Sequence, residues 1–294
     1  EECQAFEKAI ELAKKVDADI IIGTDPDCDR VGVAVKDKED YIILTGNQTG
    51  VLLIDYILSS MERIPKDGAI IKTIVTSELG RAIAESYGVE MIDTLTGFKY
   101  IGEKIKEFER DGSKKFIFGY EESNGYLAGT FVRDKDGVIS SLLICEMAAF
   151  YKSKGFSLLE ALEDIYNKYG FYKEDVISIT LKGREGLERI NRIMNALREK
   201  PPIEIEGLEV KIIKDYLNSR GYDRIKNIQW KLDLPSSEVL HFTLADGSWF
   251  AVRPSGTEPK LKIYFSAVAT TEENAEGKLQ RIKGNVIHMI EDIK

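Results

Sequence analysis

The sequence has few of the residues on which several common kinds of site depend. Its 294 residues include only three cysteines, Cys3, Cys28 and Cys145, and only two histidines, His241 and His288. The cysteines are spaced too widely for a zinc site or a disulfide framework, so a reducing, cytoplasmic location is expected. The histidines fall in strand and helix patterns and have no neighbouring serine. Neither a zinc centre nor a catalytic histidine is predicted.

Long apolar runs and a positive net charge are absent as well. The best apolar stretch, 142–150, is much shorter than the about 18 residues of a membrane span, and it contains Glu146. No basic and apolar leader opens the chain. Asp and Glu number 50 against 41 Lys and Arg, a net charge of −9, which repels a nucleic-acid backbone. We therefore expect neither a membrane nor a nucleic-acid partner.

The first part of the chain alternates apolar strands with amphipathic helices. Strands are expected at 70–75 and 116–118, among others. Helical periods are found at 5–16, 49–61, 77–87 and 98–108. Such alternation predicts an α/β domain with a largely parallel sheet. Residues 20–22 are expected to form a strand covered on both faces in a βα-type unit, and Ser77 is expected to cap a helix.

After about Tyr172 the pattern changes. Asp246-Gly247 lies between alternating apolar stretches, which predicts a hairpin within 238–252. A strand is expected at 261–268, and the closing helix repeats its apolar residues at steps of three and four. The fold class predicted for the whole chain is α/β, followed by a smaller α+β domain.

An acidic loop follows directly on the first apolar strand. Asp25, Asp27 and Asp29 stand at alternate positions, where their carboxylates repel one another unless a hard divalent cation binds. A solvated acidic turn is the alternative. An EF-hand would need glycine in place of Arg30 and glutamate in place of Lys36, so that calcium loop is excluded.

A second loop, 253–260, lies between two predicted strands. Arg253 offers a planar fork for a phosphate, while Ser255, Gly256 and Thr257 offer hydrogen-bond donors in a tight concavity. An ordinary polar turn is the alternative. The loop has no Walker-type spacing, so nucleotide binding is not indicated.

Two further loops carry weaker signals. Residues 119–125 place acceptors and a hydroxyl between glycines, which suits the hydroxyl groups of a polyol. Residues 94–99 lie at a strand-to-helix junction, where backbone amides and Lys99 suit an anion. Taken alone, each is explained at least as well by a solvated loop.

The order of these four loops resembles the α-D-phosphohexomutase superfamily, which includes phosphoglucomutases and phosphomannomutases. Residues 25–30 look like its metal loop, 96–99 like a catalytic-side loop, 121–125 like its sugar-recognition loop and 253–257 like its distal phosphate loop. The loops at 121–125 and 253–260 are most similar to the branch that holds bacterial phosphoglucomutases, phosphopentomutases and glucose-1,6-bisphosphate synthases.

The resemblance implies roles for individual residues. The implied ligands of Mg²⁺ are Asp25, Asp27 and Asp29. The implied catalytic charges are Arg30 and Lys99. The implied sugar and phosphate ligands are Glu121, Ser123, Arg253, Ser255, Gly256 and Thr257. It also implies that residues 1–42 end a second α/β domain, 43–172 form a third, and 173–294 form an α+β fourth domain.

The implied activity is the interconversion of sugar 1-phosphates and 6-phosphates, with glucose or mannose as the sugar. It would proceed through a phosphoserine and a bisphosphorylated intermediate, and a sugar 1,6-bisphosphate would be the activator. A phosphopentomutase and a glucose-1,6-bisphosphate synthase are the alternatives within enzymes, because the loops do not choose between hexose and pentose phosphates.

One part of the family pattern is missing. The motif that carries the phosphoserine pairs a serine with a histidine, and no Ser-His pair occurs in the chain, which begins at Glu1 without methionine. We therefore expect the C-terminal portion of a longer protein, inactive alone, whose partner is the phosphoserine domain. The alternative is a sugar-phosphate-binding module that never had such a domain.

Overall fold

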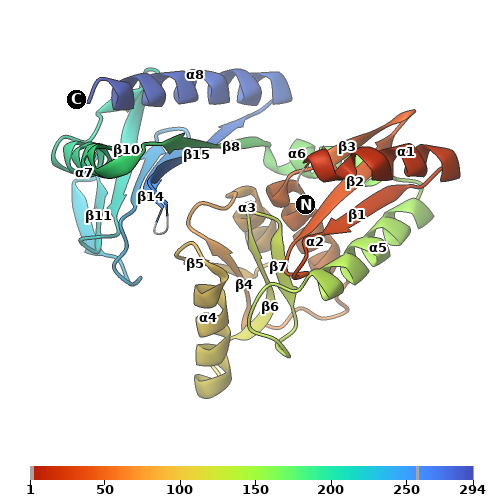
Figure 1. Ribbon diagram of the computed structural model, residues 1–294. Helices are drawn as coiled ribbons and strands as arrows, with labels where there is room; N and C mark the ends of the chain where they lie inside the picture. Colours follow the sequence, from red (N-terminus) through yellow and green to blue (C-terminus); the bar gives the residue numbers. More distant parts are fainter. Residues whose placement is uncertain (1–2, 256–257, 294) are drawn as a thin grey trace. The chain divides into compact units, whose positions relative to one another are not determined.

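A computed structural model of the protein describes residues 3–255 and 258–293 (Figure 1). The chain divides into two compact units, and the boundary between them lies between Tyr169 and Gly170. This is three residues before the boundary expected from the sequence, because strand β8 already begins at Phe171. None of the described helices is both long enough and apolar enough to cross a membrane.

The first unit opens with a small antiparallel sheet. Its elements are η1 (Cys3–Phe6), α1 (Glu7–Val16), β1 (Ile20–Thr24), β2 (Val31–Asp37) and β3 (Asp40–Leu44). The strand order is β1-β2-β3, and both pairings are antiparallel. The expectation of a βα-type unit with a fully covered strand was wrong here: β1 is only half-buried, and among the described residues it pairs with β2 alone.

The rest of the first unit is a four-stranded sheet with helices. Its elements are α2 (Gly46–Ser60), β4 (Gly68–Thr73), α3 (Leu79–Ser86), β5 (Glu90–Thr94), α4 (Phe98–Asp111), β6 (Lys115–Glu121), β7 (Gly125–Ala128), α5 (Gly137–Ser153) and α6 (Leu158–Tyr169). The order is β5-β4-β6-β7, where β4 runs parallel to β5 and β6 while β7 is antiparallel. The largely parallel sheet is confirmed, and β7 is an addition to it.

Helix starts in this sheet follow local side-chain chemistry. Thr45 and Gln48 form a reciprocal capping box at the start of α2, which satisfies two backbone amides that the helix leaves without a partner. The predicted cap at Ser77 is supported: its hydroxyl accepts from the Leu79 amide at 3.2 Å, while Glu78, directly before α3, has helical backbone angles and makes no side-chain cap.

The second unit is an antiparallel sheet with two long helices. Its elements are β8 (Phe171–Thr180), α7 (Gly183–Glu199), β9 (Glu204–Ile205), β10 (Leu208–Asp215), β11 (Arg220–Asp223), β12 (Ile228–Lys231), β13 (Leu240–Leu244), β14 (Trp249–Pro254), β15 (Lys260–Ala269) and α8 (Glu272–Glu291). The strand order is β12-β11-β10-β13-β14-β15-β8, with β9 beside β10. Apolar residues of α7, α8 and the central strands form one core. The Asp246-Gly247 hairpin and the α+β class are confirmed.

Candidate active site

The acidic loop and the sugar-recognition loop lie side by side. After β6 the chain reverses in a tight turn, in which Glu121 pairs with Gly125 and Asn124 adopts a positive φ of 62°. The Val31 amide donates to the Asn124 carbonyl at 3.1 Å, and Arg30 forms a β-bridge with Gly125. Backbone pairing thus joins the loop after β1 to the loop after β6, although about ninety residues separate them in sequence.

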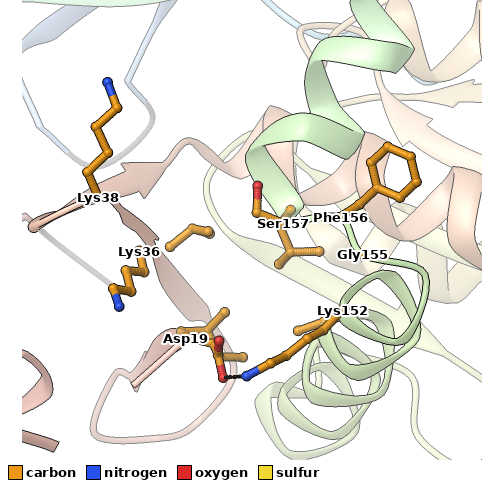
Figure 2. Close-up of a pocket in the computed structure, with 11 residues that line it drawn as sticks. Asp19, Lys36, Lys38, Lys152, Gly155, Phe156 and Ser157 are labelled. Carbon is orange, nitrogen blue, oxygen red and sulfur yellow. Dashed lines mark hydrogen bonds and ion pairs between the residues drawn. The ribbon is translucent and has the colours of Figure 1, made fainter. Parts of the chain in front are cut away.

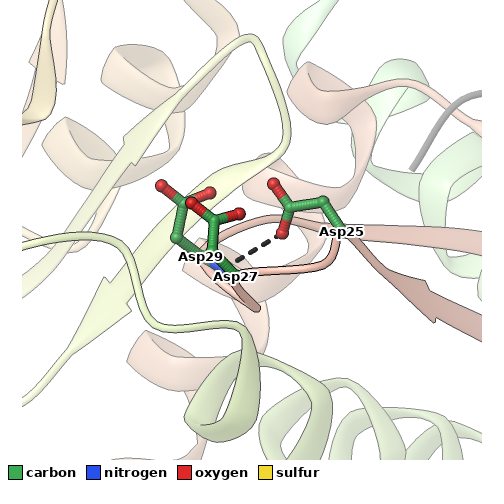
Figure 3. A group of neighbouring side chains, drawn as sticks. All are labelled: Asp25, Asp27 and Asp29. Atoms are coloured by element: carbon green, nitrogen blue, oxygen red, sulfur yellow. Dashed lines mark hydrogen bonds between the residues drawn. The ribbon is translucent and has the colours of Figure 1, made fainter.

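The carboxylates of the acidic loop converge (Figure 3). One carboxylate oxygen from each of Asp25, Asp27 and Asp29 lies within 4.8 Å of the other two. The Asp25 Oδ1 atom accepts from the amides of Asp29, at 3.1 Å, and Arg30, at 3.0 Å. Partial burial opposes ionisation of Asp25, but these amides, together with the side chains of Asp29 and Asp27, outweigh it and lower its pKa. Three convergent carboxylates are a suitable oxygen donor set for a hard divalent cation such as Mg²⁺.

One cation in the site was missed by the sequence reasoning. Lys135 Nζ lies 3.0 Å from Asp29 Oδ2, and the side chain is only 12% exposed. The ammonium also lies 5.5 Å from the ring centroid of Phe98. Burial alone would lower the pKa of Lys135, but Asp29 and Asp134 raise it overall, so the ammonium form is retained. Lys135 stands between two aspartates in the sequence, which gave it the appearance of an ordinary solvated charge.

Space for Lys135 depends on a neighbouring glycine. A Cβ atom at Gly125 would lie 2.2 Å from Cδ of Lys135. Gly125 is also the residue that bridges to Arg30. A side chain at position 125 would therefore displace Lys135 from its present position, a constraint that the sequence pattern alone did not reveal.

Glu121 is the acidic group of the sugar-recognition loop that carries an altered proton affinity. Its side chain is buried, and one carboxylate oxygen accepts from the Gly97 amide at 3.0 Å. Burial and the neighbouring Glu122 raise the pKa of Glu121 to about 7, although Gly97, Lys135 and Arg30 act in the opposite direction. A buried carboxyl that titrates near neutrality can both accept and donate hydrogen bonds to sugar hydroxyls.

Glu122, in contrast, forms hydrogen bonds within the protein. Its Oε2 atom accepts from the hydroxyls of Thr73, at 3.2 Å, and Thr76, at 2.9 Å. Thr73 ends β4 and Thr76 follows it, so this carboxylate ties the sugar-recognition loop to the turn after the central strand. Ser123, at the tip of the same loop, is exposed.

The two predicted catalytic charges have different surroundings. Arg30 Nε lies 3.9 Å from Asp29 Oδ1, so the arginine belongs to the acidic loop itself. Lys99 is exposed on the first turn of α4, where its Nζ lies 4.8 Å from the centroid of the Tyr100 ring. Within the described residues Lys99 makes no ion pair with the acidic loop. Its connection to the site is through Gly97, whose amide contacts Glu121.

The predicted phosphate loop is in the second unit. Arg253 lies near the end of β14, opposite Lys262 of β15, and the Ser255 amide donates to the Lys260 carbonyl at 2.7 Å. Gly256 and Thr257 lie outside the described residues. Arg253 forms no ion pair with any described residue.

A buried group of paired charges lies at the ends of β4 and β5 in the first unit. Lys72 is fully buried, and its Nζ lies 2.8 Å from Glu78 Oε1 and 3.1 Å from Asp93 Oδ1. Arg81 completes the group with contacts of 2.7 Å to Glu78 and 2.6 Å to Asp93. Burial disfavours ionisation of Glu78, but Lys72 and Arg81 outweigh it and lower its pKa to about 2. Lys72 also donates to the carbonyls of Thr73 and Thr76, which makes the turn that holds Glu122 rigid.

A hollow in the first unit lies away from these loops. A cavity of about 430 Å³ lies between the first sheet and the α5–α6 connection (Figure 2). Two of its three lysines are already paired, Lys36 with Asp17 and Lys152 with Asp19, the latter at 2.6 Å. None of the four predicted loops lines this cavity, so it is separate from the candidate active site.

Comparison with known proteins gives the family. The phosphoglucomutase/phosphomannomutase family models match in three places: alpha/beta/alpha domain II at residues 1–38, alpha/beta/alpha domain III at 45–169 and the C-terminal domain at 190–283. The chain belongs to the α-D-phosphohexomutase superfamily. The acidic loop of this phosphohexomutase chain falls in its domain II match, the sugar-recognition loop in domain III and the predicted phosphate loop in the C-terminal domain.

Individual relatives give the same assignment. A phosphoglucomutase of Staphylococcus aureus (strain bovine RF122 / ET3-1) is 43% identical over 267 residues, which cover 90% of this chain and 48% of that protein. The chain thus spans about half the length of the curated relatives it matches.

Solved structures share the fold. Parafusin from Paramecium, a phosphoglucomutase in an open form, has a TM-score of 0.65 at 19% identity, with 94% of this chain and 45% of that one covered. A putative phosphomannomutase from Thermus thermophilus has a TM-score of 0.63 at 18% identity, with 98% of this chain and 50% of that one covered.

Proposed function

We propose that this chain carries the metal, sugar and distal phosphate sites of a phosphohexomutase that interconverts sugar 1-phosphates and 6-phosphates, with glucose or mannose as the sugar. The observation that carries the proposal is the backbone pairing of the acidic loop, which holds the three convergent aspartates, with the loop that follows Glu121. The phosphoserine, and the domain that bears it, would come from outside this chain. Such an enzyme would work in the cytoplasm, without a membrane or nucleic-acid partner.

The residues at the reacting end would balance the negative charge of the phosphoryl group. Asp25, Asp27 and Asp29 would hold Mg²⁺, which supplies positive charge to a phosphoryl group in transfer. Arg30 and Lys135 would add positive charge beside the same carboxylates, and Lys99 would add charge from the first turn of α4. Phosphoryl transfer depends mainly on placement and on such charge, because little covalent chemistry is required of the protein.

The residues of the sugar and distal phosphate loops would orient the substrate. Glu121 and Ser123 would bind sugar hydroxyls, and Glu121 can bond in either protonation state because its pKa is about 7. Arg253, Ser255, Gly256 and Thr257 would bind the phosphate that is not reacting. A site that holds one phosphate while the other reacts accepts either end of the substrate, as a mutase with a bisphosphorylated intermediate requires. A sugar 1,6-bisphosphate would therefore be the activator.

The proposal is tested by reconstitution. A coupled assay would contain glucose 1-phosphate, Mg²⁺ and a catalytic amount of glucose 1,6-bisphosphate. The 294-residue chain alone should show no turnover, and adding the separately produced upstream segment of the natural protein should restore it. Turnover of about 1–10³ s⁻¹ by the chain alone would refute the proposal that the phosphoryl-carrying group lies outside this chain. Replacing the substrate by ribose 1-phosphate, and separately measuring bisphosphate synthesis, distinguishes the phosphopentomutase and synthase alternatives.

The same system tests the distal phosphate loop. Arg253→Ala should raise KM for glucose 1-phosphate at least tenfold, since a charge-assisted bond of about 1.5–3 kcal/mol is lost. Arg184→Ala, on an arginine of α7 that is 93% exposed, is the matched control and should leave KM unchanged. An unchanged KM in Arg253→Ala would remove that loop from the site. Failure of reconstitution together with tight binding of glucose 1-phosphate would favour a non-catalytic binding module.

A further inference from the structure

The acidic loop contains a residue in an unfavourable backbone conformation. Cys28 has a φ of 55°, in the left-handed region that residues with a Cβ avoid for steric reasons. Its own amide donates to the Asp25 carbonyl at 3.0 Å, which closes a turn around Asp27. This turn brings the next two amides, of Asp29 and Arg30, to the Asp25 carboxylate. The convergence of the aspartates therefore depends on Cys28 keeping this conformation.

A contact from another element holds Cys28 in place. The amide of Gly137, the first residue of α5, donates to the Cys28 carbonyl at 2.9 Å. The first amide of a helix has no partner within the helix, so this amide is free to donate elsewhere. The next two amides are capped by the Asp136 side chain, that of Val138 at 2.9 Å and that of Ile139 at 3.0 Å. The first amide of α5 is thus used on the acidic loop.

The contact has room only for glycine. A Cβ atom at position 137 would lie 2.7 Å from the Cys28 carbonyl oxygen and 3.2 Å from the Arg30 carbonyl oxygen. Both are backbone atoms, so no side-chain rotation can relieve the overlap. The φ of Gly137 is not positive, so glycine is required here by the close approach and not by its own backbone conformation.

The segment that contains Gly137 also contacts the sugar-recognition side. The Asp136 amide donates to the Tyr126 carbonyl of β7 at 2.9 Å, and Lys135 pairs with Asp29. Residues 135–137 therefore connect β7 and the acidic loop through three consecutive residues. A displacement at Gly137 would be transmitted to the carboxylates, because its neighbours are held on both sides.

We propose that Gly137 is a positioning residue for the metal site: by donating to the Cys28 carbonyl with no Cβ in the way, it holds the acidic loop in the conformation in which its three carboxylates converge. The inference rests on the proposed metal site of the acidic loop. It assigns to α5 a function that goes beyond packing, and it makes the metal affinity of the loop depend on a residue that is not itself a ligand.

The test is Mg²⁺ titration calorimetry on the 294-residue chain. Gly137→Ala should weaken Mg²⁺ binding at least tenfold while the thermal unfolding midpoint changes little. Val138→Ala, at the next residue and 70% exposed, is the matched control and should bind as the unaltered chain does. Affinity of Gly137→Ala within twofold of the unaltered chain would overturn the inference and leave the metal site standing. Absence of Mg²⁺ binding in the unaltered chain would overturn both the inference about Gly137 and the proposed metal site.

A second pair of variants decides the matter if Gly137→Ala fails to fold. Cys28→Gly favours the same positive φ and should retain Mg²⁺ affinity within twofold. Cys28→Val places a β-branched residue there and should weaken binding at least tenfold, without any change in α5. Equal affinity of the two Cys28 variants would overturn the inference, because the loop conformation would then not control metal binding.

Discussion

Two clusters of charged side chains in the first unit differ in how their charges are balanced. Lys72, Glu78, Arg81 and Asp93 carry two positive and two negative charges, and each lies within about 3 Å of an opposite charge. The acidic loop carries three carboxylates within 4.8 Å of one another, and its paired cations are Lys135 and Arg30 at its edge.

On the proposed function, the difference separates charges that stabilise the fold from charges that would bind a cation. Buried charges are tolerated in a protein only when they are paired and hydrogen-bonded, and the Lys72 cluster meets that condition internally. The acidic loop does not, and an added cation would complete it. Charge balance, more than the number of acidic residues, is therefore the useful criterion for distinguishing the two clusters.

The largest effect is expected from breaking the balanced cluster. Lys72→Met removes one charge from a fully buried group and leaves Glu78 and Asp93 with Arg81 alone, which should lower the free energy of unfolding by about 3–5 kcal/mol. Mg²⁺ affinity should stay within twofold. Hydrogen exchange in β4 and β5 is the suitable readout, because both tryptophans, Trp230 and Trp249, lie in the second unit.

Lys104→Met is the matched control for that prediction. Lys104 pairs with Glu107 at 2.7 Å on the partly exposed face of α4, where an ion pair contributes little to stability. Equal losses of unfolding free energy in the two variants would mean that the buried Lys72 cluster stabilises the fold no more than a surface ion pair does. A parallel loss of Mg²⁺ affinity in Lys72→Met would mean that the two clusters are not separate.

A pH dependence of intermediate size is expected from Glu121 of the sugar-recognition loop. Its pKa is raised from an ordinary value of 4.5 to about 7, so between these values the unfolded chain is ionised while the folded chain keeps the proton. The free energy of unfolding should therefore fall as pH rises from about 4.5 to 7 and then level off. The total fall should be on the order of 2–3 kcal/mol, reduced by partial exposure.

Glu121→Gln removes the titrating group and should abolish this part of the pH dependence. Urea unfolding of both proteins at pH 5 and pH 8, followed by hydrogen exchange in β6, measures the difference. If the two proteins show the same change in stability between these pH values, the raised pKa of Glu121 does not contribute to folding, and the contrast with Asp25, whose pKa is lowered, would lose its basis.

The comparison of the clusters also shows what the sequence could reveal. The acidic loop was predicted because its aspartates stand at alternate positions in one short segment, and the parallel strands were predicted because apolar runs alternate with helical periods. Lys72 and Lys135 were not, because their partners are distant in sequence or their neighbours suggest a solvated loop. Strand β7 was missed because it has four residues and follows a three-residue turn. Short elements and long-range charge pairs depend on tertiary contacts, which periodicity does not encode.

The smallest effect, and the one specific to the unbalanced cluster, is expected from Asp27→Asn. Asp27 is exposed, so its replacement should change the free energy of unfolding by no more than about 0.5 kcal/mol in the absence of metal. Loss of one anionic oxygen should nevertheless weaken Mg²⁺ binding about tenfold, or ~1.4 kcal/mol. Asp37→Asn, in the same unit but outside the acidic loop, is the control and should leave both quantities unchanged. Unaltered Mg²⁺ affinity in Asp27→Asn would place the ion elsewhere, and a large loss of stability would mean that the acidic loop, like the Lys72 cluster, serves to hold the fold together.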